Sequence, residues 1–174
     1  MNTLDLPVPT FTPLAPARMR QFQVYDDFAA GVAARWLAGE IRSVARRNCE
    51  ETSEMWKIDV AMQFGKFREM TMQDAGEADV LIVAVSAAGE PSSAFLEWLE
   101  ELAPWRANRP HPGLLVGLLG EAATEAVELD VLTLALGQFA RSAEMEFIWQ
   151  PMGVHAMGDS DWVMPALERL ISRR

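Results

Sequence analysis

The sequence predicts a single three-layer α/β domain: a five-stranded parallel sheet of order 2-1-3-4-5, doubly wound with helices on both faces. The first observation is Val80–Val85, a continuous apolar run that is typical of a central strand covered on both sides. The second is the alternation of strand-like with helix-like segments, because such connections cross over to a parallel neighbour. The third is the length of 174 residues, which suits one domain with this strand order.

The five predicted strands are short segments rich in branched and aromatic residues, bounded by polar and turn-forming residues. The second shows only moderate alternation of apolar and polar side chains, and the fifth is expected to stop at Pro151. The predicted strands cover residues 21–25, 55–60, 80–85, 113–119 and 145–149.

The five predicted helices carry apolar residues at three- to four-residue spacing, with charged residues on the opposite side. The second is expected to bury Phe67, Met70 and Ala75, and Thr124 is the expected cap of the fourth. The helices are predicted over 29–47, over 65–77, from 91 to a loop at 104–112, over 124–143, and after a cap at Ser160 or Asp161.

Composition excludes several classes of function. The net charge of −10 would repel nucleic-acid backbones, so we expect no nucleic-acid partner. The apolar runs are far shorter than the ~20 residues that cross a bilayer, and the chain begins without a signal-peptide pattern; we expect no membrane partner and a cytoplasmic location. One cysteine and two histidines offer no metal cluster. Residues 1–20 hold four prolines and are predicted to form an N-terminal arm before a domain over 21–174.

The candidate site follows from the strand order. In such a sheet a ligand binds at the carboxyl ends of the first and third strands, where the direction of winding reverses. The loops at this switch point are predicted at 25–30, 86–91 and 120–124. The residues predicted to contact a cofactor or other ligand there are Asp26, Asp27, Phe28, Ala29, Ser86, Ala87, Gly89 and Gly120.

Asp26 and Asp27 have two interpretations. Their carboxylates could hold a divalent cation, or they could cap the following helix by accepting hydrogen bonds from its free amide groups, which we favour. Ser86 is the one hydroxyl at a strand end of the switch point, but neither histidine has a spacing that predicts a partner for it. We therefore assign no catalytic residue and no metal ligand.

Four segments resemble the flavodoxin-like proteins, and in particular their NAD(P)H-dependent FMN reductase branch. They are the central strand Ala78–Val83, the turn ending in Pro91, the helical segment Phe95–Leu99 and the second strand Trp56–Val60. The resemblance covers roughly residues 21–174 and implies an FMN whose phosphate lies in the loop after the first strand.

The chain departs from this pattern at the cofactor loops. Asp26 and Asp27 stand where the family has hydrogen-bond donors, and their charges would repel a phosphate. The turn at 86–89 lacks the aromatic ring that the family places beside the flavin. We therefore expect no cofactor and a non-catalytic binding or interaction module, with a homodimer or another protein as partner. The alternative is a flavin-dependent NAD(P)H oxidoreductase that binds FMN.

A second resemblance is to response-regulator receiver domains, which share this strand order. Asp26 and Asp27 are similar to their magnesium-binding acidic pair. The third strand ends at Val85 and Ser86, without the aspartate that receivers phosphorylate, and Gln150 stands where they have a lysine. A signalling module without phosphotransfer is therefore a third interpretation.

Overall fold

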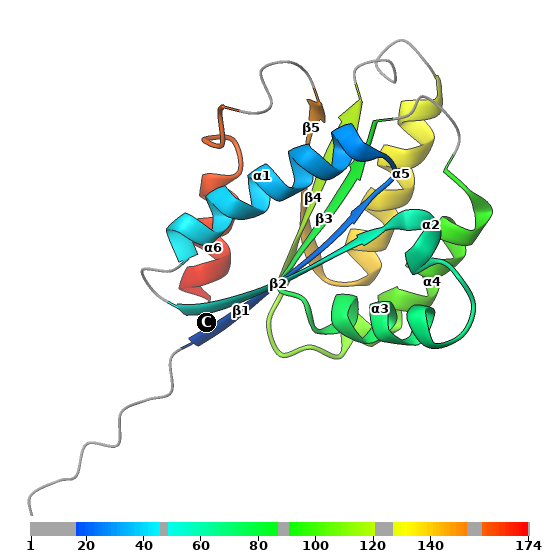
Figure 1. The fold of residues 1–174 in the computed structure, drawn as a ribbon. Coiled ribbons are helices and arrows are strands. Elements are labelled where there is room, and N and C mark those ends of the chain that lie inside the picture. The colour runs from blue at the N-terminus through cyan, green and yellow to red at the C-terminus, as the bar shows by residue number, and fades with distance from the viewer. Residues whose placement is uncertain (1–16, 46–48, 87–90, 121–126, 153–157, 174) are drawn as a thin grey trace, which may run out of the picture.

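The computed structural model describes residues 17–45, 49–86, 91–120, 127–152 and 158–173. The strands are β1 (Ala17–Tyr25), β2 (Cys49–Lys57), β3 (Val80–Val85), β4 (Gly113–Gly120) and β5 (Met145–Met152) (Figure 1). The helices are α1 (Phe28–Ala45), α2 (Ile58–Ala61), α3 (Lys66–Glu77), α4 (Ser93–Ala107), α5 (Val127–Ser142) and α6 (Met164–Ser172). No helix in these ranges is long and apolar enough to span a membrane.

The sheet has the order β2-β1-β3-β4-β5 and all its strand pairs are parallel, so the predicted architecture is confirmed. The most apolar run, Val80–Val85, is β3 and pairs with β1 on one side and β4 on the other. The chain moves outward from β1 to β2 and then returns to β3 on the opposite side of β1. This reversal brings the carboxyl ends of β1 and β3 side by side.

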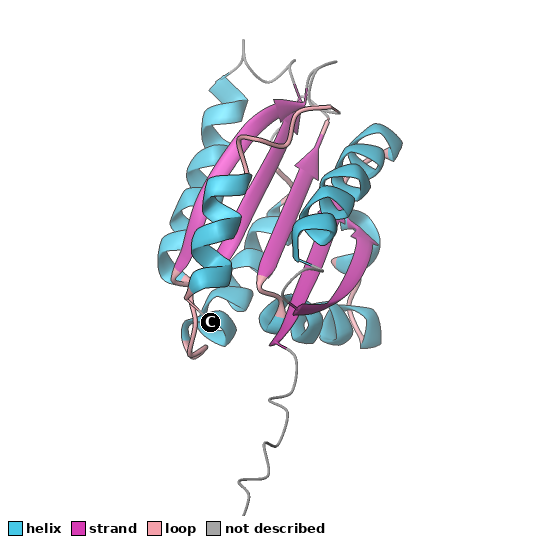
Figure 2. Cartoon of the chain, turned by 90° about the vertical axis from the view of Figure 1, so that its left-hand side faces the viewer, coloured by secondary structure: helices cyan, strands magenta, loops and turns pink. Residues whose placement is uncertain are grey.

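Helices cover both faces of the sheet (Figure 2). Alternate strand residues point to opposite faces, and so two hydrophobic layers form. One layer joins the sheet to α1 and α6 and includes Ile82 and Leu37. The other lies beneath α3, α4 and α5, where the ring of Trp98 is 6.2 Å from that of Phe22 and 6.1 Å from that of Phe95.

The second strand differs most from its prediction. It runs from Cys49 to Lys57, so the strand predicted over 55–60 is wrong at both ends, and residues 58–60 belong to α2. The polar stretch 50–54 is part of β2 because an edge strand pairs on one side only and tolerates charge. Its inward polar groups meet buried glutamines of β1. Gln21 Nε2 donates to Glu51 at 3.1 Å, and Gln23 Nε2 donates to Ser53 at 2.6 Å.

Other strands run beyond their predicted ends. β1 begins at Ala17 and so includes residues 17–20, while the rest of the predicted arm lies outside the described residues. β5 continues through Pro151 to Met152 because it is an edge strand, where a proline need not interrupt the hydrogen-bond ladder.

Helix details also differ from the predictions. The side chains of Phe67 and Met70 on α3 are 49 % and 40 % exposed, whereas Ala75 is buried as predicted. α6 starts after Val163, which makes no side-chain cap, so neither Ser160 nor Asp161 caps it. α4 continues through Pro104 to Ala107, into the segment predicted as a loop. Thr124 lies outside the described residues.

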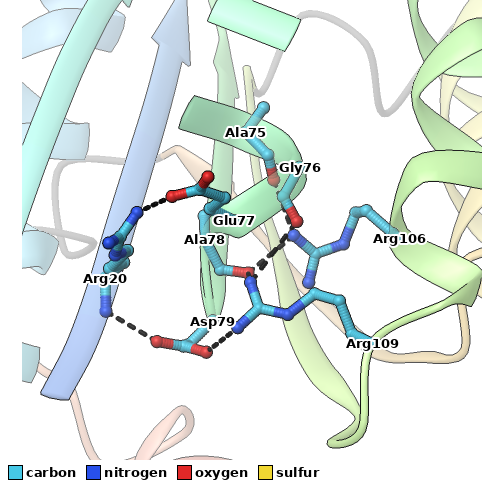
Figure 3. A network of polar contacts seen from close by, with 8 residues as sticks. All are labelled: Arg20, Ala75, Gly76, Glu77, Ala78, Asp79, Arg106 and Arg109. Atoms are coloured by element: carbon cyan, nitrogen blue, oxygen red, sulfur yellow. Dashed lines mark hydrogen bonds and ion pairs between the residues drawn. The ribbon is translucent and has the colours of Figure 1, made fainter. Parts of the chain in front are cut away.

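A polar network ties the amino edge of the sheet together (Figure 3). Arg106 of α4 donates to the carbonyl oxygens of Ala75 and Ala78, at 2.6 Å each, and so adds a charged donor to carbonyls at the end of α3. Arg109 donates to Asp79 at 2.8 Å, and the other oxygen of Asp79 accepts from a backbone amide of β1 at 2.7 Å. Arg106 of α4 and Arg109, just after this helix, thus join α3, β3 and β1 at this edge.

Candidate functional site

The carboxyl edge of the sheet brings together residues from three strand ends. Asp26 and Asp27 follow β1, Ser86 follows β3, and Gly120 is the last residue of β4. A Cβ atom added at Gly120 would lie 2.4 Å from the carbonyl oxygen of Ser86, so glycine lets these two strand ends approach closely. The structure therefore gathers these four predicted residues at the switch point.

Asp26 fixes the end of β3 against the end of β1. The amide of Ser86 donates to both carboxylate oxygens of Asp26 at 3.0 Å, and the amide of Asp27 donates to Oδ1 at 2.8 Å. The amide of Asp26 donates in turn to the carbonyl of Ala84 at 3.2 Å. The Asp26 carboxylate is thus held by backbone donors on both sides of the switch point.

Asp27 caps α1, as the capping interpretation predicts. Its Oδ1 accepts a hydrogen bond from the amide of Ala30 at 2.9 Å, and its Oδ2 accepts one from the hydroxyl of Ser86. These two hydrogen bonds, the one from Ala30 first, hold the pKa of Asp27 below its ordinary value. Asp27 is therefore an anion at neutral pH.

The remaining predicted residues are exposed at the start of α1 or lie outside the described residues. Phe28 is the first residue of α1 and is 85 % exposed, and Ala29 beside it is also exposed. Ala87 and Gly89 are outside the described residues. Contact between any of the eight residues and a ligand stays a prediction.

A cavity of about 420 Å³ lies beside Asp26, between α2 and the start of α4. This volume is in the range of small-molecule sites. Its walls combine apolar side chains with a few polar groups, and they comprise Asp26, Ile58, Asp59, Met62, Gln63, Ser92 and Ala94. Of these residues only Asp26 is among the predicted site residues, because the sequence pattern places Ile58 and Asp59 inside the second strand and Ser92 at the start of a helix. Residues 50–54 hold no apolar side chain, so the sequence shows no alternation there that would locate the ends of this strand.

The charge around this cavity is mainly negative. Asp26 and Asp59 are the ionisable side chains among its lining residues. Lys57, at the end of β2, donates to Asp59 at 2.9 Å, and this hydrogen bond lowers the pKa of Asp59. In the described part of the chain, no group of three or more acidic, histidine or cysteine side chains is arranged to hold a metal ion.

The start of α1 does not fit a phosphate group. At an effective dielectric constant of 20, two like unit charges 4 Å apart repel each other by about 4 kcal/mol. A phosphate placed beside Asp26 and Asp27 would meet repulsion of this order from each carboxylate. The cavity walls at Ile58, Met62 and Ala94 are different, because their apolar surfaces suit a planar ring.

A larger cavity, of about 760 Å³, lies between α4 and α5. Its walls are mostly apolar and include Leu99, Val131 and Phe139. None of the strand-end residues lines it, so it is separate from the switch point. We assign the candidate site to the smaller cavity because that cavity adjoins Asp26 and the reversal of the sheet.

No protein-family model matches the sequence, and no curated protein matches it. Solved structures do match the fold. An NADH:FMN oxidoreductase in its apo form has a TM-score of 0.57 at 12 % identity, over 88 % of this chain and 87 % of its own. An oxidoreductase from Corynebacterium diphtheriae has a TM-score of 0.55 at 14 % identity, over 90 % and 93 % of the two chains. A short-chain flavodoxin associated with a non-canonical PDU bacterial microcompartment has a TM-score of 0.54 at 10 % identity, over 88 % of this chain and 97 % of its own.

These similarities correct the prediction that the chain has no cofactor. Structures of the same fold include a flavodoxin and an FMN oxidoreductase, so the comparisons point to a flavin rather than to none. Two of the named structures are oxidoreductases, the class of protein in the alternative interpretation. The chain has a flavodoxin-like fold, and its structural neighbours include FMN reductase-like proteins.

Proposed function

We propose that this chain binds a flavin at the carboxyl edge of β1, β3 and β4 and acts as an oxidoreductase that oxidises a reduced nicotinamide. The observation that carries the proposal is the cavity of about 420 Å³ beside Asp26, at the reversal of a 2-1-3-4-5 sheet. Ligands of open α/β sheets bind at this position. The oxidoreductases among the structural neighbours support the same class of chemistry.

The cavity offers two kinds of surface to such a ligand. Ile58, Met62 and Ala94 provide apolar contact for a planar ring, and Ser92 and Gln63 provide polar groups at its edge. The oxygen of Ser92 already accepts from the amide of Phe95 at 3.2 Å, so this side chain caps α4 and is held in position. The proposed contacts therefore come from elements that are fixed in the fold.

A pair of matched variants tests where the flavin binds. Ala94→Trp would fill the cavity beside Asp26, and Ala135→Trp would fill the larger cavity between α4 and α5. We expect the wild-type chain and Ala135→Trp to quench flavin fluorescence on binding and to oxidise NADH when flavin is supplied, and Ala94→Trp to do neither.

Two outcomes would contradict the proposal. If the wild-type chain binds no flavin and shows no flavin-dependent NADH oxidation, the proposed function is wrong. Flavin binding that is lost in Ala135→Trp and kept in Ala94→Trp would move the site to the larger cavity. Circular dichroism of each variant checks that the comparison is made between folded proteins.

The assembly and location of the protein stay proposals. A homodimer or another protein partner is expected from the sequence, as is a cytoplasmic location. Size-exclusion chromatography with light scattering measures the assembly directly, and a monomer at micromolar concentration would contradict the homodimer.

A further inference from the structure

On the basis of the proposed function, we propose that this site takes a flavin without a phosphate, such as riboflavin, and that Asp27 discriminates against the phosphorylated form. The starting point is the disagreement between the residues at the start of α1 and the phosphate of FMN. The fold places this helix start at the switch point, while the chain fills it with carboxylates.

The anion-binding position of α1 is already occupied by the chain itself. A helix N-terminus binds anions through amide groups that lack a partner within the helix. Here the amide of Ala30 donates to Asp27 Oδ1 at 2.9 Å, and the amide of Asp27 itself donates to Asp26 Oδ1 at 2.8 Å. Two of the amides that would receive a phosphate are thus satisfied by the two aspartates.

Neither carboxylate is free to turn away from an incoming anion. The second oxygen of Asp27 accepts from the hydroxyl of Ser86. Asp26 accepts from the amides of Ser86 and Asp27, at 3.0 and 2.8 Å. Rotating either side chain would leave these donors without their acceptors, which is costly where the donor is partly buried. The two negative charges are therefore fixed parts of the switch point.

The same carboxylates suit a neutral ligand that carries hydroxyl groups. An ionised carboxylate only accepts hydrogen bonds, and each of its oxygens can accept more than one. The sugar-alcohol chain of riboflavin offers hydroxyl donors and no charge. The apolar walls at Ile58 and Met62 lie in the cavity next to Asp26 and suit the ring of the same molecule. The two surfaces together match a flavin that ends in hydroxyl groups.

The test is a parallel titration of the full chain with riboflavin and with FMN, followed by the quenching of flavin fluorescence. We expect riboflavin to bind at least tenfold more tightly than FMN. Asp27→Asn removes the charge and keeps a good N-cap residue, so we expect it to raise the affinity for FMN about tenfold and to change that for riboflavin less than threefold. Asp159→Asn is the matched control, because the exposed Asp159 also accepts from a backbone amide, that of Asp161 at 2.9 Å; it should leave both affinities unchanged.

The outcomes separate this inference from the proposed function. If the wild-type chain binds FMN as tightly as riboflavin, the proposed discrimination is wrong, whereas the proposed flavin site is supported. Binding of neither flavin would overturn the proposed function as well. An unchanged ratio of the two affinities in a folded Asp27→Asn chain would show that Asp27 is not the discriminating group. If Asp27→Asn does not fold, Asp27→Ser provides another uncharged cap for the same comparison.

Discussion

The two edges of the sheet use charge in opposite ways. At the amino edge, Arg106 is 2 % exposed and donates hydrogen bonds to backbone carbonyls, while Arg109 forms an ion pair with Asp79. At the carboxyl edge, Asp26 and Asp27 accept from backbone amides and stay partly or largely exposed, and Asp26 lines a cavity. The first edge is held together by a buried arginine and its neighbours, whereas the second presents exposed carboxylates. The comparison contrasts charged side chains that tie elements of the fold together with charged side chains that stay accessible to a ligand.

Burying a charged arginine at the amino edge has an energetic cost. Burial, with the nearby positive charge of Arg109, lowers the pKa of Arg106 to about 10. Desolvation thus opposes the charged form, while the hydrogen bonds to Ala75 and Ala78 hold it in place. At the carboxyl edge, the pKa of Asp27 is lowered because its hydrogen bonds outweigh desolvation of an exposed group.

The largest effect is expected at the amino edge. Arg106→Met should lower the free energy of unfolding by about 3 kcal/mol, because two hydrogen bonds from a charged donor are lost, at roughly 1.5–3 kcal/mol each. The two carbonyls keep only the amide of Ala78 and the side chain of Arg109 as donors. Urea denaturation measures this loss. Arg35→Met, at an exposed position of α1, should change stability by less than about 0.5 kcal/mol. A loss at Arg106 no larger than that of this control would contradict a structural role for the amino edge.

The two glycines at the ends of β4 sharpen the comparison. An added Cβ would lie 2.3 Å from Arg106 Nη2 at Gly113 and 2.4 Å from the Ser86 carbonyl oxygen at Gly120. Gly113→Ala and Gly120→Ala should each cost about 1–3 kcal/mol of unfolding free energy. Only Gly120→Ala should also weaken flavin binding, because it displaces Ser86.

The control for this pair is Gly39→Ala, where an added Cβ meets no atom within 4 Å. In the middle of α1 it should raise stability by about 0.5–1 kcal/mol. Equal losses of flavin affinity in Gly113→Ala and Gly120→Ala would mean that the two edges do not differ in function.

A smaller loss of stability is expected from removing the Asp26 carboxylate. Asp26→Ala should lower the unfolding free energy by about 1–2 kcal/mol, since the amides of Ser86 and Asp27 lose their acceptor. Asp26→Asn keeps one oxygen and should lose less. Thermal unfolding followed by circular dichroism ranks the two variants, and the reverse ranking would contradict the role given to this carboxylate.

The smallest effect is a dependence of stability on pH. The folded pKa of Asp27 lies below its unfolded value of 3.8, so the unfolded chain takes up this proton first as the pH falls. The contribution of Asp27 to the free energy of unfolding is fully present above its pKa in the unfolded chain. It is lost as the pH falls through its pKa in the folded chain. The difference in Tm between the wild-type chain and Asp27→Asn should therefore shrink from neutral pH to about pH 2. A difference that grows toward acid would contradict the assigned direction.

The apolar part of the fold could be predicted because burial on both faces leaves a local pattern. Val80–Val85 has no polar residue to interrupt it, and its flanking helices repeat at helical spacing. The edge strand β2 could not be found in this way, because its inward side chains include Glu51 and Ser53. Their partners, Gln21 and Gln23, are known only once the strands are paired.

For the same reason, only some residues of the candidate site could be predicted from the sequence. Asp26, Asp27, Ser86 and Gly120 could be predicted, because strand order alone places strand ends together. The cavity residues of α2 depended on the end of β2, and this end was misplaced by three residues, from Lys57 to Val60. The amino-edge network depends on Arg106, which lies in a helical turn that Pro104 led us to predict as a loop. Contacts between distant segments are fixed by packing, which a local pattern does not encode.

The salt dependence of FMN affinity, measured for the wild-type chain and for Asp27→Asn, tests the central claim most directly. The Debye length, over which salt screens charge, shortens from about 10 Å at 0.1 M salt to about 3 Å at 1 M. If Asp27 repels the phosphate, wild-type affinity for FMN should rise with salt, and this rise should be smaller in Asp27→Asn, while riboflavin affinity stays level in both. A wild-type affinity for FMN that falls as salt is added would show that the phosphate binds favourable positive charge or amide groups, and would contradict the account.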